Sequence, residues 1–224
     1  MPVYQVSPKP KQSFFSNLSV TTNLILINLV VFILATILIA SKAVSIEFIA
    51  IKPSNILAGK YLWTFITSMF MHAGFFHLFA NMFSLFFVGS LLERIIGRRR
   101  YFSFYLIAGL FAGLIFVLSA LIFPSDFNTY AVGASGALFG IVGVLVFLTP
   151  NLPVYIMFIP IPIKMKYAAP GILVVLWLIS SLSGGSIPIG NTAHLGGLLA
   201  GIVYGIYLKN KFPNKIRRIS KIFQ

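Results

Sequence analysis

The sequence predicts an all-α membrane protein, built as a bundle of six transmembrane helices. Of its 224 residues, 58% are hydrophobic and only 9% are charged, whereas soluble domains are roughly 45–50% apolar and about 25% charged. So few charged residues cannot cover a soluble core, and the high hydrophobicity excludes a disordered chain. One span takes about 20 apolar residues, so this length accommodates about six spans. The chain has no cysteine, which excludes disulfides and thiolate chemistry.

Apolar stretches without charge locate the spans along the chain. The first lies within a charge-free run between residues 12 and 41, and because no cleavage site follows it, we expect it to remain as an anchor. Proline and glycine clusters separate the later spans, since these residues interrupt helices, as at Pro150, Pro160 and Gly184–Gly185. The predicted spans cover residues 23–40, 75–92, 101–123, 135–148, 167–181 and 193–208.

The basic residues are distributed unevenly between the two ends of these spans. The N-terminus, the loops after the second and fourth spans and the C-terminal segment together hold 14 of the 17 lysines and arginines. Basic loops face the cytoplasm, which predicts that both termini are cytoplasmic and explains the net charge of +14 without nucleic acid as a partner. We therefore expect a cytoplasmic segment 1–19, a membrane domain 20–208 and a basic cytoplasmic tail 209–224 that contacts lipid head groups.

The loop after the first span, residues 42–71, is long and fairly apolar. Tyr61, Leu62 and Trp63 are typical of a segment that lies in the outer membrane interface. A plain external loop explains the same residues, and the sequence leaves both interpretations open.

Unusual polar residues gather at one end of three parallel spans. With the N-terminus inside, the second, fourth and sixth spans all begin on the external side. Their first turns hold His77 and Asn81, which share a helix face, then Ser135, and finally His194. Polar groups inside a span are costly and indicate a functional site. Small residues would let the fourth and sixth spans approach closely; they are Gly136, Gly140, Ala193, Gly197, Gly201 and Gly205.

These residues predict nucleophilic catalysis by a serine. A serine hydroxyl becomes nucleophilic when a base takes its proton, and His194 can act as that base and later as the acid. Ser135 begins a helix, where unpaired backbone N–H groups stabilise an oxyanion, and His77 and Asn81 can add donors. The acids Glu47, Glu93 and Asp126 lie in loops or at the cytoplasmic end, so we expect a dyad rather than a Ser-His-Asp triad.

Three motifs in this order resemble the rhomboid family of intramembrane serine proteases. Residues 133–136, with the sequence GASG, resemble the family's GxSG motif, and His77 with Asn81 resembles its HxxxN element. Residues 193–201 resemble its AHxxGxxxG signature. The resemblance extends over roughly residues 63–205 and includes the order and spacing of the motifs.

The resemblance implies an enzyme that cleaves peptide bonds in or near transmembrane segments of other membrane proteins. It implies Ser135 as nucleophile, His194 as general base, and His77, Asn81 and Ser135 around the oxyanion. The loop 182–192 would cover the site, which opens to the external side. Supporting positions are Gly133, Gly136, Phe139, Gly197 and Gly201, with Phe139 standing where many members carry Tyr.

Other classes of function fit the sequence less well. A metalloprotease needs a ligand set such as HExxH, which is absent, so we expect no metal and no cofactor. A small transporter would show internal repeats and broken helices at mid-membrane. A catalytically silent rhomboid-like protein that binds clients would lack the serine or the histidine. His72 either contacts the oxyanion region or caps the start of the second span. The expected location is the cell membrane of a prokaryote, as a multi-pass protein.

Overall fold

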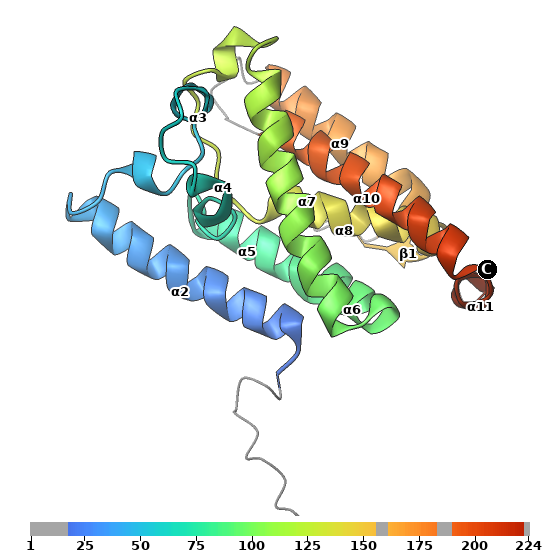
Figure 1. The fold of residues 1–224 in the computed structure, drawn as a ribbon. Helices are drawn as coiled ribbons and strands as arrows, with labels where there is room; N and C mark the ends of the chain where they lie inside the picture. Colours follow the sequence, from blue (N-terminus) through green and yellow to red (C-terminus); the bar gives the residue numbers. More distant parts are fainter. Residues whose placement is uncertain (1–17, 156–160, 183–189, 222–224) are drawn as a thin grey trace, which may run out of the picture.

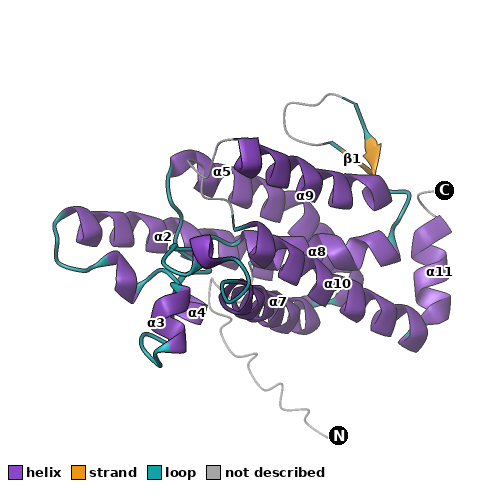
Figure 2. Ribbon diagram, turned by 90° about the horizontal axis from the view of Figure 1, so that it is seen from above, coloured by secondary structure: helices purple, strands orange, loops and turns teal. Residues whose placement is uncertain are grey.

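The computed structural model describes residues 18–155, 161–182 and 190–221, and it is almost entirely helical (Figures 1 and 2). The long helices are α2 (Val20–Ala40), α7 (Arg98–Ser119), α8 (Ser135–Leu148), α9 (Met165–Leu182) and α10 (Asn191–Lys211). The second span consists of α5 (Phe75–Ser84), a π-helical stretch η2 (Leu85–Gly89) and α6 (Ser90–Ile96). The prediction of an all-α fold is confirmed.

Within the described residues, four helical stretches are long and apolar enough to cross a membrane. They are Val20–Ala40, Phe75–Ile96, Arg98–Ser119 and Met165–Leu182. The helix α8 is apolar but has only 14 residues. The molecule is therefore a multi-pass membrane protein.

The observed helix ends differ from the predicted ones by a few residues, except in α8. The third span ends at Ser119 instead of residue 123, because the backbone turns back onto Ser119 before Pro124 begins a 3₁₀ turn, η3 (Pro124–Asp126). The predicted tail from residue 209 is largely helical, since α10 continues to Lys211 and α11 (Pro213–Lys221) follows. Proline suits the first position of a helix, where no N–H partner is needed. The predicted segment 1–19 lies almost wholly outside the described residues.

The segment between α2 and α5 contains short helices rather than an irregular loop. These are η1 (Ile46–Phe48), α3 (Pro53–Leu57) and α4 (Thr64–Thr67). Phe48, Leu62 and Trp63 are about half exposed, and an exposed apolar surface of this kind favours the interfacial interpretation of this segment. Two short antiparallel strands, β1 (Pro153–Val154) and β2 (Ile163–Lys164), precede α9.

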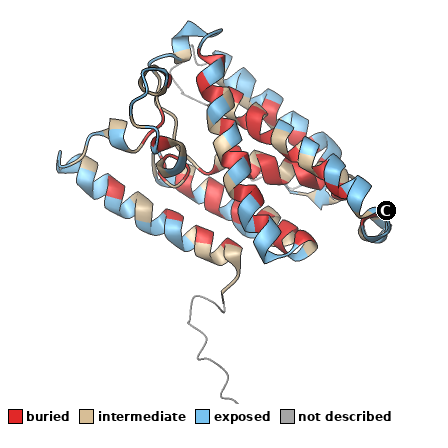
Figure 3. Ribbon diagram, viewed as in Figure 1, coloured by how far each residue is buried: buried red, intermediate tan, exposed pale blue. Residues whose placement is uncertain are grey.

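The core lies where α7, α8 and α10 meet, while α2 is mostly exposed at the edge (Figure 3). The helix α8 packs against α7, α9 and α10, and small residues line its contact with α7. An added methyl group on Gly136 or Gly140 would lie 2.6 Å from the Cβ atom of Ala112 or Ala108, respectively. This close packing holds the N-terminal half of α8 against α7.

Candidate active site

Ser135 and His194 meet at the beginnings of two packed helices. Ser135 is the first residue of α8, and His194 is the fourth residue of α10. Their Oγ and Nε2 atoms are 2.8 Å apart, which is a hydrogen-bond distance. A nucleophile and a base can exchange a proton across this contact.

Glycine contacts explain how a short serine side chain reaches the histidine. A Cβ atom added to Gly197 would collide with the carbonyl oxygen of Gly136, and one added to Gly201 would collide with that of Gly140. The backbones of α8 and α10 are therefore in direct contact along two turns. Such contacts between small residues are the usual means of close packing for membrane helices.

The imidazole of His194 is buried and held by packing. The Phe139 ring stacks on it, with 4.6 Å between centroids and 20° between planes. In the described part of the chain, Nδ1 of His194 has no hydrogen-bond partner. The three acidic side chains accept hydrogen bonds from other groups: Glu93 from Thr21, Glu47 from Tyr130, and Asp126 from Ser125. Among the described residues, Ser135 and His194 therefore have no acidic third partner.

His77 lies near Ser135, against the backbone of Gly133. A Cβ atom on Gly133 would lie 2.9 Å from both Cε1 and Nε2 of His77 and 3.7 Å from Oγ of Ser135. Gly133 has φ +124, a conformation that only glycine adopts readily. It therefore permits both the turn into α8 and the close approach of the imidazole.

The hydrogen bond on the other side of His77 determines its tautomer. Its Nδ1 accepts from the backbone N–H of Ala73 at 3.4 Å. A neutral imidazole that accepts at Nδ1 carries its proton at Nε2. The Nε2–H group faces the Gly133 side, where it can donate to an oxyanion formed at Ser135.

Asn81 stands one turn further along α5 and is buried. Its side-chain N–H donates to the carbonyl of His77 at 2.8 Å, which uses one of the two amide protons. The structure therefore groups His77, Gly133, Ser135 and His194 directly and places Asn81 behind His77.

His72 is fully buried beside this group. Its Nε2 accepts from the backbone N–H of Ala134 at 3.4 Å, and its ring meets that of His77 edge to face at 5.1 Å. No described side chain caps the start of α5, so the structure does not support the capping interpretation of His72. Its ring instead contacts the backbone of Ala134, the residue before Ser135.

The backbone that leads into α8, residues 131–134, is hydrogen-bonded to the segment between α2 and α5. Ile51 and Ala131 form a two-way backbone bridge, with N···O distances of 3.1 and 2.9 Å. The Gly133 N–H also donates to the Ser68 carbonyl at 2.8 Å. The backbone before Ser135 is therefore fixed from residue 131 onward.

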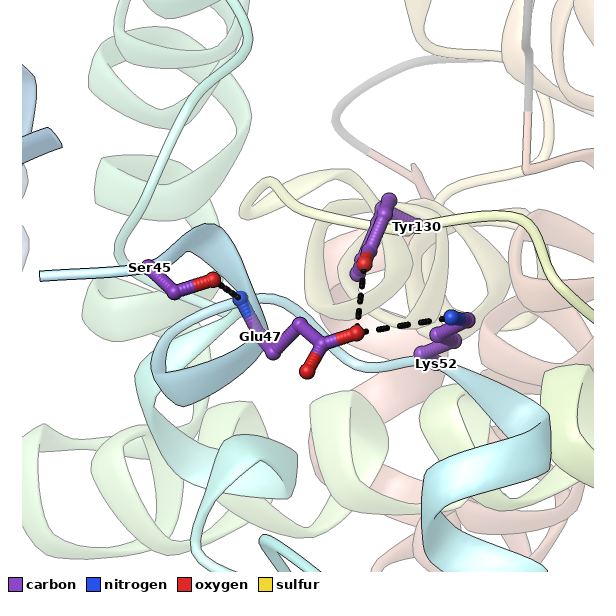
Figure 4. Close-up of polar contacts among 4 residues, drawn as sticks. All are labelled: Ser45, Glu47, Lys52 and Tyr130. Carbon is purple, nitrogen blue, oxygen red and sulfur yellow. Dashed lines mark hydrogen bonds and ion pairs between the residues drawn. The ribbon is translucent and has the colours of Figure 1, made fainter. Parts of the chain in front are cut away.

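A polar cluster reinforces this connection, as Figure 4 shows. The Tyr130 hydroxyl donates to the Glu47 carboxylate at 2.9 Å, and Lys52 pairs with the same oxygen at 3.5 Å. The Tyr130 hydrogen bond, aided by Lys52, holds the pKa of Glu47 below its usual value. Sequence reasoning missed this cluster, because no local pattern pairs residues 83 positions apart.

Comparison with known proteins assigns the family. The rhomboid domain family model matches residues 59–211. RHOMBOID-like protein 6, mitochondrial, of Arabidopsis thaliana is 38% identical over 162 residues, which cover 71% of this chain and 48% of that protein. Rhomboid protein 1, mitochondrial, of Saccharomyces cerevisiae is 32% identical, over 68% of this chain and 44% of that protein. Rhomboid-like protease 1 of Toxoplasma gondii is 30% identical, over 80% of this chain and 57% of that protein.

The chain spans about half the length of these relatives. The matched region nevertheless contains the residues that surround Ser135, from His72 to Gly201. The family match covers well over half of the chain, so the chain belongs to the rhomboid family.

Proposed function

We propose that this chain is an intramembrane serine endopeptidase that hydrolyses peptide bonds in or near transmembrane segments of other membrane proteins. The observation that carries the proposal is the 2.8 Å contact between Ser135 Oγ and His194 Nε2 at the adjoining ends of α8 and α10. The rhomboid family match and the relative named as a protease support it.

The residues of the site suggest how the reaction proceeds. His194 takes the proton of Ser135 as the oxygen attacks the substrate carbonyl, and then delivers it to the leaving amine. Water attacks the resulting acyl-enzyme with His194 again as base, which regenerates the serine. The proposed donors to the developing oxyanion are the Nε2–H of His77 and the free N–H groups at the start of α8, with the second amide proton of Asn81 as a further candidate.

The length of α8 suggests the depth of the site. Its 14 residues extend about 21 Å at roughly 1.5 Å per residue, which is less than the roughly 30 Å apolar thickness of a bilayer. If Leu148 lies at the cytoplasmic boundary, Ser135 lies below the external surface. Non-helical backbone at that depth must line a cavity or protein, and residues 131–134 meet this condition by packing on residues 51–68.

The full topology belongs to the same proposal. We assign six spans, with α8 and α10 as the fourth and sixth, both termini in the cytoplasm, and a site that opens externally. Transmembrane protein substrates and the bilayer are the partners; metal, cofactor and nucleic acid have no role. Seven of the eleven residues of the predicted covering loop 182–192 lie outside the described residues. The named relatives are eukaryotic, two of them mitochondrial, so they give no support to the prediction of a prokaryotic cell membrane.

The test compares purified wild type with Ser135→Ala in proteoliposomes that contain a single-span substrate with helix-weakening residues near its external end. Ser84→Ala is the matched control, because Ser84 is an exposed serine outside the site. A serine-reactive fluorophosphonate probe is applied in parallel. We expect cleavage and labelling in wild type and in the control, and neither in Ser135→Ala.

Two results would contradict the proposal in different ways. Cleavage that survives in folded Ser135→Ala would exclude Ser135 as the nucleophile. Folded wild type that shows neither cleavage nor labelling would favour a silent client-binding protein.

A further inference from the structure

Positive charge is concentrated at the end of the bundle remote from Ser135. Arg94 lies near the end of α6, the arginines 98–100 begin α7, and residues 209–221 hold six more lysines and arginines. Glu93 is the only acid on these elements, and it is buried and accepts hydrogen bonds from Thr21. The ion pair between Lys52 and Glu47 lies at the opposite end. Residues 209–221 include no acid, so this end of the bundle carries a large excess of positive charge.

The helix α11 is held in a defined place at this end. It lies across the end of α10 (Figures 1 and 2). Ile216 is only 6% exposed and belongs to the main core cluster. The Lys215 Nζ group donates to the carbonyl of Ile95, in the last turn of α6, at 2.8 Å. These contacts fix α11 while Arg217, Arg218 and Lys221 remain exposed.

A cation from α7 lies beside α11. Arg100 of α7 and Lys215 line a cavity of about 70 Å³ between α11 and the bundle, whose other walls are apolar. The cavity has room for a few water molecules only, so a ligand must bind on the outer face of α11. The Arg100 guanidinium lies 4.9 Å from the centre of the Phe212 ring, which holds it next to α11.

We propose that the exposed face of α11, with Arg217, Arg218 and Lys221, binds the phosphates of anionic phospholipid head groups. Arg217 and Arg218 lie four and three residues before Lys221, so each of them is a neighbour of Lys221 on the helix surface. Two or three of them can contact one phosphate at a time. The face lies where α10 leaves the bundle, which is the level of the head groups, and anionic head groups attract basic segments at that level. The proposal does not depend on catalytic activity.

The experiment measures lipid retention by the full chain in detergent, using native mass spectrometry. The protein is offered equal amounts of dioleoylphosphatidylglycerol, which is anionic, and dioleoylphosphatidylcholine, which is not. Arg217→Gln/Arg218→Gln removes two exposed cations of this face. Lys42→Gln/Lys60→Gln is the matched control, because it removes two exposed cations at the opposite end.

We expect wild type to retain the anionic lipid preferentially. The double arginine variant should lose roughly 25-fold in affinity for it, since each cation near an anionic surface contributes roughly fivefold. The control should retain its preference, and circular dichroism should show both variants folded. Equal retention of the two lipids by wild type, or equal loss in both double variants, would overturn the proposal.

Discussion

A methyl group added at Gly197 tests whether the contact between α8 and α10 positions the dyad. The Cβ atom of Gly197→Ala would collide with the carbonyl oxygen of Gly136, lie 2.9 Å from its carbonyl carbon, and lie 3.3 Å from the amide nitrogen of Gly140. All three are backbone atoms, so no side-chain rotation can relieve the collision. The two helices must move apart.

The structure gives the size of the effect. Relief of the collision requires a separation of about 1 Å, because non-bonded carbon atoms approach only to about 3.5 Å. His194 lies one turn away on the same helix, so its 2.8 Å contact with Ser135 lengthens beyond the hydrogen-bond range of about 3.2 Å. A displacement of about 1 Å reduces catalysis on the order of 10²-fold. Overpacking of this kind lowers the free energy of unfolding by about 1–3 kcal/mol.

The assay is the initial cleavage rate in proteoliposomes, measured well below the unfolding midpoint of the variant. Gly171→Ala in α9 is the matched control for stability, because no atom lies within 4 Å of a Cβ atom at that position. It should keep or raise the midpoint, since alanine in a helix is favoured over glycine by up to about 1 kcal/mol. Folded Gly197→Ala that cleaves at the wild-type rate would refute the reasoning.

Three further substitutions test other parts of the structure. Asn81→Ala should reduce the cleavage rate by about 10²–10³ and leave residual activity, because other oxyanion donors remain; an unchanged rate would exclude Asn81 from the oxyanion site. Glu93→Gln should lower the free energy of unfolding by about 1.5–3 kcal/mol, because the charged acceptor of two hydrogen bonds from Thr21 is lost. Denaturation of wild type and variant measures this difference. In Tyr130→Phe the pKa of Glu47 should rise toward 4.5. The stability that wild type gains from this hydrogen bond is present above about pH 4.5 and is lost as the pH falls through the lower pKa of Glu47 in the folded state. If wild type still has a higher unfolding midpoint than Tyr130→Phe below that pKa, the hydrogen bond to ionised Glu47 is not the source of the difference.

The sequence predicted the positions of the long helices because their signals are local. Apolar runs bounded by charges or by proline gave α8 with both ends correct, and the other spans to within a few residues. The proximity of Ser135 and His194 was predicted from two observations taken together. Alternating span direction puts the starts of α8 and α10 at the same end, and glycines four residues apart allow the two helices to touch.

Contacts between distant segments could not be predicted in the same way. The Glu93 carboxylate accepts bonds at the start of α2, more than 70 residues earlier, and the bridge between Ile51 and Ala131 spans 80 positions. Each depends on how whole helices are packed, which no local pattern encodes. The sequence predicted a basic tail where the structure has α11, because charged residues dominate the composition of this segment. The buried side chain of Ile216 is the apolar contact that holds α11 in place.

The positioning of His194 shows why packing and chemistry are inseparable in this site. An acid that fixes the imidazole through Nδ1 would keep its orientation even if the helices shifted slightly. Here the described residues offer Nδ1 no partner, and the ring is held by the Phe139 face and by Ser135 itself. Both of these residues belong to α8, whereas His194 belongs to α10. The distance between Ser135 and His194 therefore depends on the glycine contact between the two helices, and in the proposed mechanism a substitution in that contact acts directly on the reaction.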